Sequence, residues 1–254
     1  MRLPPLYEDL NFLSPMSEQR AAVLAAWLAA GLQDGGTVID VGCGWGELLL
    51  RVTADAPLSE GVGVDINPAF LIEAQRRATE RGLGKRVSFL QGEGSISGPD
   101  QVDALIAIGA TQVWGPPTTA GQPLDYDAAL TAIRERVRRG GRVVFGDGIW
   151  SQPPTPEATA PLAGRDDELV SLATLTEQAV VHGFGVAGVR EASLEEWDDF
   201  ESRYSAGYTH WLTQHDTNHA DAEAVREKAR SQRQGYLGGY RKTLGHAFLQ
   251  LVAL

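Results

Sequence analysis

The chain has 254 residues, a formal net charge of −11 and a hydrophobic fraction of 43%. A chain of this length can bury a full apolar core, and a charged fraction of 22% is ordinary for a folded protein and excludes wholesale disorder. The acidic balance argues against a nucleic-acid partner, because binding to phosphates needs clustered positive charge.

The single cysteine, Cys43, excludes an intramolecular disulfide and a multi-cysteine zinc site, and it is consistent with a reducing compartment. The apolar run at 21–30 is too short to span a membrane, and acidic residues precede it. It therefore fits one face of a helix better than the core of a signal peptide. We expect a cytoplasmic protein, monomeric or homodimeric, without a membrane partner.

Short apolar segments alternate with helical segments along the chain. The expected helices cover 17 to about 31, a stretch from Glu47 onward, 67 to about 82, 127–139 and 166–181. The expected strands are 37–41, 61–65, 87–90, 102–108, 142–145, one near Val186, and 245–254. This alternation indicates a mostly parallel sheet with helices on both faces. Four arginines, at 134, 136, 138 and 139, are expected at the end of the fourth helix.

Three stretches are longer than the connections that this alternation of strands and helices needs, and each follows a predicted parallel strand. They are 111–126, 149–165 and 194–242. Connections that leave the carboxyl ends of parallel strands emerge on one edge, where open α/β sheets bind ligands. The extra sequence is therefore expected above a binding site.

The turn from Asp40 to Gly46, with the sequence DVGCGWG, is the most informative segment. Its glycines allow a sharp turn and a close approach of a ligand to the backbone. A dinucleotide fingerprint requires a third glycine where this chain has Glu47, whose charge would also disfavour a pyrophosphate. The spacing instead suits a zwitterionic ligand.

Residues 38–46 resemble motif I of the class I S-adenosylmethionine-dependent methyltransferases. The resemblance continues in order along the chain and covers about 20–190, through the segments 64–68, 89–93, 103–108 and 140–145. It implies S-adenosylmethionine as cofactor, S-adenosylhomocysteine as product, and methyl transfer by in-line displacement to an oxygen, nitrogen or carbon of a small molecule.

The resemblance also implies a cofactor-binding set. Asp40 and the turn residues would hold the methionine end of the cofactor, Asp65 the ribose hydroxyls, and Ile66 one face of the adenine. Glu93, where the family usually has aspartate, would lie beside the adenine amino group, and the N–H of Gly94 would face the ring. The complete set is Asp40, Gly42, Cys43, Gly44, Gly46, Asp65, Ile66, Glu93, Gly94 and Ile108. Cys43 is interpreted as a small turn residue rather than a nucleophile.

Substrate residues are expected from the long connections. Trp114 and Trp150 fall just past strand ends, where the methyl group should point. An aromatic stripe at helical spacing comprises Trp197, Phe200, Tyr204, Tyr208 and Trp211. Such a stripe can pack a helix onto its domain or line a lid. The substrate candidates are Trp114, Trp150, Tyr204, Tyr208 and Trp211.

A hydroxyl acceptor must lose a proton, and the candidate bases are Asp147, His210 and His215. Asp147 directly follows a strand, although it can also serve only to cap a turn. His210, His215 and His219 lack a cysteine or an acidic partner set, so no metal site is expected. The remaining histidines, His182 and His246, are interpreted as structural.

We expect one methyltransferase domain over 1–254, with an α/β fold and a doubly wound, mostly parallel seven-stranded sheet whose last strand is antiparallel. An N-terminal helical cap (1–36), a cofactor-binding core (37–190), a helical lid insertion (194–242) and a final strand (243–254) make up this domain. Two alternatives stay open: a nicotinamide-dependent oxidoreductase, which Glu47 disfavours, and a non-catalytic protein that binds S-adenosylmethionine. Methylation of RNA or protein is disfavoured by the acidic charge and by the sequence 109–113, which lacks an Asn/Asp-Pro-Pro-Tyr-type motif.

Overall fold

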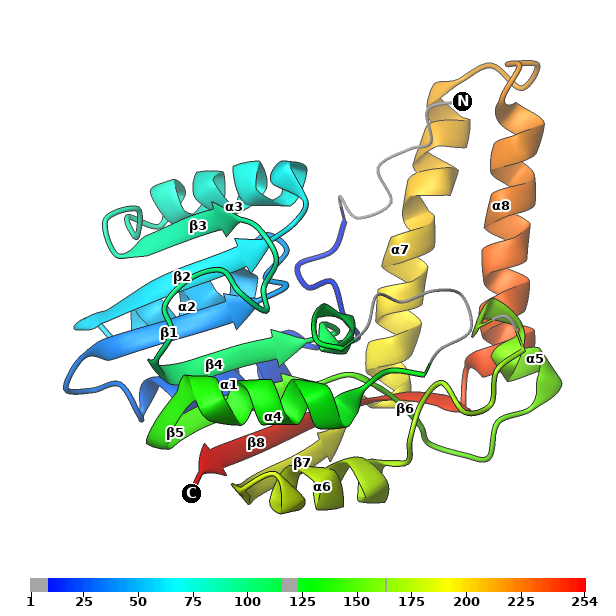
Figure 1. Cartoon of the computed structure of the whole chain (residues 1–254). Helices are drawn as coiled ribbons and strands as arrows, with labels where there is room; N and C mark the ends of the chain where they lie inside the picture. Colours follow the sequence, from blue (N-terminus) through cyan, green and yellow to red (C-terminus); the bar gives the residue numbers. More distant parts are fainter. Residues whose placement is uncertain (1–8, 116–122, 163) are drawn as a thin grey trace.

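The computed structural model describes residues 9–115, 123–162 and 164–254 (Figure 1). Within these residues one eight-stranded sheet has the order β3-β2-β1-β4-β5-β8-β6, and β7 pairs with β8. Strands β1 to β5 are parallel, whereas β8 runs antiparallel to β5, β6 and β7. The strands are β1 (Gly36–Val41), β2 (Ser59–Asp65), β3 (Val87–Gln91), β4 (Val102–Ile108), β5 (Val137–Gly146), β6 (Gly148–Trp150), β7 (Phe184–Glu191) and β8 (Leu244–Ala253).

The expected α/β fold, with a mostly parallel sheet and an antiparallel last strand, is confirmed. Strand β6 adds an eighth strand, which is only three residues long and therefore carries little sequence pattern. Strand β5 begins earlier than expected, because Val137 is already extended and pairs with Val102. Arg138 and Arg139 consequently lie in a strand rather than at a helix end.

Helices cover both faces of the sheet, with α4 and α6 on one face and α1 and α2 on the other (Figure 1). Ser17 caps α1 and Asn67 caps α3, as their positions before the helices predict. The helices are α1 (Glu18–Ala29), α2 (Glu47–Asp55), α3 (Pro68–Glu80), α4 (Tyr126–Arg136), α5 (Pro156–Thr159), α6 (Leu172–Val181), α7 (Leu194–Gln214) and α8 (Ala222–Gly235). Short 3₁₀ turns occupy Thr111–Val113 and Ala160–Leu162, and a π-helical turn, Tyr236–Tyr240, follows α8.

The long insertion before the last strand forms an antiparallel hairpin of α7 and α8, which rises beyond the carboxyl edge of the sheet (Figure 1). Tyr208 of α7 packs on Val225 and Ala229 of α8 and fixes the two helices together. Residues 9–17, which precede α1, pass between the sheet edge and α7 (Figure 1). None of the helices in the described ranges has the length and apolar character that a membrane crossing requires.

Candidate functional site

The glycine turn joins β1 to α2 at the carboxyl edge of the sheet. Gly42, Gly44 and Gly46 have φ angles of 70°, 54° and 69°, in the left-handed region that favours glycine. The N–H of Gly42 donates to the carbonyl oxygen of Val64 over 2.9 Å, which ties the turn to the end of β2. A Cβ on Gly46 would lie 2.7 Å from a ring carbon of Phe89. Both conformation and packing therefore require glycine here.

Asp65, the last residue of β2, is held in place by the backbone around it. One carboxylate oxygen, Oδ2, accepts a hydrogen bond from the N–H of Gly44 over 2.8 Å. The other, Oδ1, accepts one from the N–H of Asn67 over 2.8 Å. Since a carboxylate has about four acceptor positions, lone pairs remain for a ligand that donates two hydroxyls. The carboxylate is thus oriented before any ligand binds.

Asp40 lies deeper, at the end of β1, and only 5% of it is exposed. Burial raises the pKa of its carboxyl group from 3.8 to about 8, and the nearby charge of Asp65 raises it further. A bound cation would favour the ionised form. Burial also raises the pKa of the Cys43 thiol, and Asp40 adds to the effect. A thiol of this kind is a poor nucleophile, which agrees with its interpretation as a turn residue.

The predicted adenine contacts lie at an open surface beside Asp65. Ile66 is 72% exposed, and Glu93 is exposed on the loop after β3. The N–H of Gly92 donates to the backbone carbonyl of Asp65 over 3.1 Å, so this loop lies beside the end of β2. Gly94 is buried, and a Cβ on it would lie 2.4 Å from Cγ1 of Val41. Close packing thus requires glycine at position 94.

The predicted methionine end is enclosed by the segment before α1, which we call the N-terminal cover (residues 10–16). The indole N–H of Trp45 donates to the carbonyl oxygen of Asn11 over 2.6 Å. Leu13 reaches the glycine turn, where its Cδ1 lies 2.7 Å from a Cβ built on Gly44. A cavity of about 60 Å³ remains, lined by Asn11, Phe12, Leu13, Ser14, Met16, Asp40, Gly42, Cys43, Gly44, Trp45, Glu47, Leu48, Ile106 and Ile108.

Sequence reasoning assigned residues 1–36 to an N-terminal helical cap and did not predict that residues 10–16 cover the glycine turn. The only signal of this cover was a set of apolar residues within a proline-rich stretch. Leu10 is 4% exposed and Phe12 is 8% exposed. Leu10 clusters with Trp45, Phe200 and Tyr204, so the cover bridges the glycine turn and α7.

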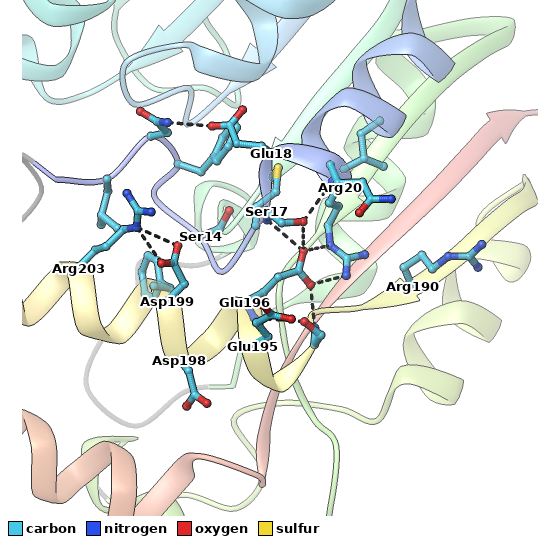
Figure 2. A pocket seen from close by; sticks show the side chains of 18 of the residues that line it. Ser14, Ser17, Glu18, Arg20, Arg190, Glu195, Glu196, Asp198, Asp199 and Arg203 are labelled. Carbon is cyan, nitrogen blue, oxygen red and sulfur yellow. Dashed lines mark hydrogen bonds and ion pairs between the residues drawn. The ribbon is translucent and has the colours of Figure 1, made fainter.

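A larger cavity of about 920 Å³ lies on the other side of the cover, between α1 and the first turns of α7 (Figure 2). Here the Glu196 carboxylate accepts hydrogen bonds from the hydroxyl of Ser17 over 2.7 Å and from Nε of Arg20 over 2.7 Å. Glu196 also completes a capping box with Ser193 at the start of α7. These bonds join the base of α7 to the start of α1.

Glu196 is 8% exposed, and burial by itself would raise the pKa of its carboxyl group. Hydrogen bonds from Arg20, Ser17 and backbone N–H groups outweigh burial and hold this pKa at about 2. The carboxylate is therefore ionised at neutral pH and acts as a fixed anchor for α7.

Glu47 lies at the start of α2, next to the glycine turn. Its carboxylate forms ion pairs with three arginines. It pairs with Arg51, with Arg77 at 3.0 Å and with Arg81 at 2.7 Å. Its charge is therefore compensated, which removes the electrostatic argument against a pyrophosphate. The glycine spacing remains as the sequence argument against a dinucleotide.

The candidate substrate residues fall into separate places. Trp114 and Trp150 are 6% and 8% exposed, and the indole N–H of Trp150 donates to the carbonyl oxygen of Asp166 over 2.8 Å. Tyr208 packs against α8, and Trp211 stacks on His215 with ring centroids 4.0 Å apart. Among the five candidates, Tyr204 is the one that clusters with Trp45 beside the glycine turn. Their roles in binding an acceptor stay predictions.

The three candidate bases are also dispersed. His210 lies on the C-terminal half of α7, with Nδ1 3.4 Å from Oδ2 of Asp9, and His215 follows the last turn of α7. Asp147 lies at the carboxyl edge of the sheet, 7% exposed. Its Oδ2 accepts from the N–H of Thr111 over 3.0 Å and its Oδ1 from the N–H of Gly148 over 2.7 Å. Asp147 therefore does cap its turn, and Thr111, which it binds, follows Ala110, whose Cβ lies 3.0 Å from a Cβ built on Gly42 of the glycine turn.

Sequence reasoning interpreted His246 as structural, yet the fold brings it to this same edge. It is 6% exposed, and it pairs across the sheet with Gly148, the neighbour of Asp147. Nothing in the local sequence around position 246 indicates this neighbourhood. Across residues 9–115, 123–162 and 164–254, no group of three or more histidine, cysteine, aspartate or glutamate residues could hold a metal ion.

Known proteins resemble this chain both in sequence and in fold. A family model of a methyltransferase domain matches residues 38–141. YjhP of Escherichia coli, described as uncharacterized, is 25% identical over 243 residues, which cover 94% of this chain and 93% of YjhP.

Solved structures match over nearly the whole chain. A S-adenosylmethionine-dependent methyltransferase from Geobacter sulfurreducens, in complex with S-adenosylhomocysteine, has a TM-score of 0.82 at 24% identity and covers 98% of this chain and 96% of its own. One from Thiobacillus denitrificans, with the same ligand, has a TM-score of 0.80 at 25% identity, with all of both chains covered. Motif order, sheet order and these relatives agree: residues 38–141 match a methyltransferase domain, and the whole chain is similar in fold to S-adenosylmethionine-dependent methyltransferases.

Proposed function

We propose that this enzyme transfers the methyl group of S-adenosylmethionine to a small-molecule acceptor bound between the sheet edge and the α7–α8 hairpin. The observation that carries the proposal is the oriented Asp65 carboxylate beside the glycine turn, held by the N–H groups of Gly44 and Asn67. The chemistry of this site fits the cofactor: a ribose that donates hydroxyls, and a positively charged methionine end.

The cofactor would be held along the carboxyl edge of the sheet. Asp65 binds the ribose, Ile66 and the 91–94 loop flank the adenine, and Asp40 faces the cationic methionine end. The glycine turn leaves its backbone open to close approach. When bound, the cofactor supplies an activated methyl group on a sulfonium, so the protein has mainly to position the acceptor and exclude water.

The net charge of the protein and the covered cavity beside Asp40 both support a small acceptor. The net charge of −11 disfavours nucleic acid. The N-terminal cover lines the cavity of about 60 Å³ beside Asp40, where the methionine end would lie. Residues 194–242 act in this proposal as a lid that admits the acceptor and then closes. A macromolecular acceptor would instead need an open approach.

The experiment measures binding of S-adenosylhomocysteine by calorimetry in wild type, Asp65→Ala and Glu60→Ala. Glu60 is the matched control, because it is exposed at the opposite end of the same strand. Asp65→Ala should weaken binding by about 1.5–3 kcal/mol, the value of hydrogen bonds to a charged group. Equal affinity in all three proteins would refute the assignment of the cofactor site.

The acceptor class is tested with S-adenosylmethionine that carries a radioactive methyl group. A cell extract is separated into small molecules, RNA and protein, and each fraction is offered to the enzyme. Label incorporated into the small-molecule fraction supports the proposal. Label found only in the RNA or protein fraction contradicts it.

A further inference from the structure

His246 lies on the same face of the sheet as Ile106 and Ile108, two residues that line the cavity beside Asp40. In the sheet register Asp40 of β1 pairs with Ile106 of β4, and Ile108 of β4 pairs with Gly146 of β5. Ile106 and Ile108 both line that cavity. Strand β8 adjoins β5 on the far side.

The ring of His246 belongs to the same face of the sheet as this cavity. Alternate residues of a strand share one face, so His246 lies on the face of Phe248, and their ring centroids are 4.8 Å apart. Phe248 packs in one apolar cluster with Ile106 and Val144, which neighbour the cavity. His246 is therefore separated from the cavity wall by the width of β5.

Gly146 is the residue of β5 between them, and it carries no side chain. A Cβ placed on Gly146 would lie 3.6 Å from Nε2 of His246, so this nitrogen lies over the backbone of β5. Nε2 is buried and has no hydrogen-bond partner within the described residues. A buried polar atom without a partner is costly, and one beside a ligand cavity indicates a partner that arrives with the ligand.

The charged groups that face the imidazole come from three elements: Asp147 after β5, Arg20 of α1 and Glu196 of α7. Burial lowers the pKa of His246 to about 4, Asp147 and Glu196 oppose this effect, and Arg20 adds to it. The ring is neutral at pH 7 and can accept a proton. A carboxylate beside it stabilises the imidazolium that then forms.

We propose that His246 is the base that takes the proton of an acceptor hydroxyl, and that Asp147 is its positioning residue. The proposal rests on the proposed function. An acceptor oxygen forms a bond to the methyl carbon, the carbon–sulfur bond breaks with its electron pair going to sulfur, and the hydroxyl proton passes to Nε2. The site keeps its charge, because a positive sulfonium is replaced by a positive imidazolium.

A hydroxyl is the acceptor class that this arrangement favours. A neutral amine can attack before it loses a proton, whereas a hydroxyl needs a base in the transition state. His210 and His215 lie at the C-terminal end of α7, where Nδ1 of His210 pairs with Asp9 rather than with a carboxylate at the sheet edge. His246 and Asp147 instead lie at the sheet edge next to Gly146, which pairs with Ile108 of the cavity wall.

The test observes the ring nitrogens of the histidines by ¹⁵N NMR in the complex with S-adenosylhomocysteine. His246→Gln assigns one signal among the five histidines. Phenol is the hydroxyl probe, and toluene is the matched probe of similar shape without a hydroxyl. Phenol should shift the His246 signal and toluene should not. Asp147→Asn should change the tautomer and the titration of that signal while phenol still binds.

Activity gives a second readout, with methyl transfer to phenol measured against pH. His246→Gln should lower the rate by about 10²-fold or more and remove the acidic limb of the profile, with the affinity for S-adenosylhomocysteine within about twofold of wild type. His182→Gln is the control, since His182 lies at the end of α6 and pairs with Asp127. Three outcomes overturn the proposal. They are a His246 signal that does not shift at saturating phenol, failure of phenol to bind, and equal rates in the two variants. Loss of S-adenosylhomocysteine binding in wild type would instead overturn the proposed function.

Discussion

The two halves of the candidate cofactor site differ in how they are built. The half around Asp65 is open, and its neighbour Ile66 is 72% exposed. The half around Asp40 is closed, because the N-terminal cover lies over the glycine turn and Asp40 is 5% exposed. The open half is made from adjacent pieces of β2 and β3, whereas the closed half needs α1, α7 and the cover.

This difference has a consequence for ligand entry. The cavity beside Asp40 measures about 60 Å³, and residues of the N-terminal cover form one of its walls. We therefore expect cofactor binding to move the cover. Changes in the closed half should affect both stability and ligand exchange, while changes in the open half should affect affinity alone.

The largest effect is expected from Glu196→Ala. It leaves the guanidinium of Arg20, whose side chain is 15% exposed, without its carboxylate partner. Breaking a buried ion pair in this way costs about 3–5 kcal/mol of unfolding free energy. Asp199→Ala is the matched control on the same helix, because its pair with Arg203 is exposed and worth about 1 kcal/mol at most. Denaturant unfolding that gives equal losses in both variants would contradict the anchoring role.

The same anchor has a predictable pH dependence. The folded-state pKa of Glu196 is about 2 and its ordinary value is 4.5, so the folded state favours the carboxylate. Its stabilisation is fully present above about pH 4.5 and is lost as the pH falls toward 2. Wild type should therefore lose stability over this range more steeply than Glu196→Gln.

The next largest effect is expected from Asp40→Asn. The ammonium group at the homocysteine end favours the carboxylate, so the affinity of wild type for S-adenosylhomocysteine should rise with pH up to about 8, where Asp40 is ionised on its own. The variant should bind about 1.5–3 kcal/mol more weakly at pH 8, without that slope. Calorimetry in buffers of different ionisation enthalpy measures the proton released. A pH-independent affinity in wild type would count against Asp40.

Asp40 also affects the stability of the free protein, in the opposite direction to Glu196. Its folded-state pKa is raised from 3.8 to about 8, so the folded state holds a proton that the unfolded state releases. Its contribution to the free energy of unfolding should fall as the pH rises from about 4 to 8. Asp40→Asn should therefore become more stable relative to wild type across this range. Thermal unfolding of both proteins at several pH values measures this difference.

A smaller effect is expected from Trp45→Phe, which removes the hydrogen bond from the indole N–H to the carbonyl of Asn11. The variant should lose about 0.5–1.5 kcal/mol of stability, and exchange of amide hydrogens in the N-terminal cover should accelerate. Trp27→Phe on α1 is the control for the loss of an indole, since the ring of Trp27 packs against the guanidinium of Arg142. Unchanged exchange in the cover would show that this bond does not hold it.

The smallest effect is expected in the open half, from Ile66→Ala. Because Ile66 is 72% exposed, stability should stay within about 0.5 kcal/mol of wild type. Affinity for S-adenosylhomocysteine should fall by about 1 kcal/mol, through the loss of apolar contact with the adenine. Ile72→Ala on α3, 74% exposed, should change neither quantity. A large loss of stability in Ile66→Ala would remove the contrast between the halves.

The features that could be predicted from the sequence are those that local spacing dictates. The glycines of the turn adopt left-handed backbone angles, and Asp65 closes a strand that pairs with β1, so five motifs in order were enough to predict the cofactor. The parallel sheet followed from the alternation of strands and helices. The start of β5 was missed, because the helical pattern runs on through arginines that the structure places in a strand.

Only the tertiary structure decided how the site is closed and which groups meet in it. Glu196 binds Arg20 across 176 residues of sequence, Trp45 binds Asn11 across 34, and β8 brings His246 to the edge where Asp147 lies. Periodicity and motif spacing indicate the conformation of one segment, but they do not indicate which distant residues that segment contacts in the fold. The sequence by itself determined the cofactor and the alternation of strands and helices along the chain, because both depend on local backbone geometry. The cover, the anchor of α7 and the neighbours of His246 depend on long-range packing, which only the folded chain determines.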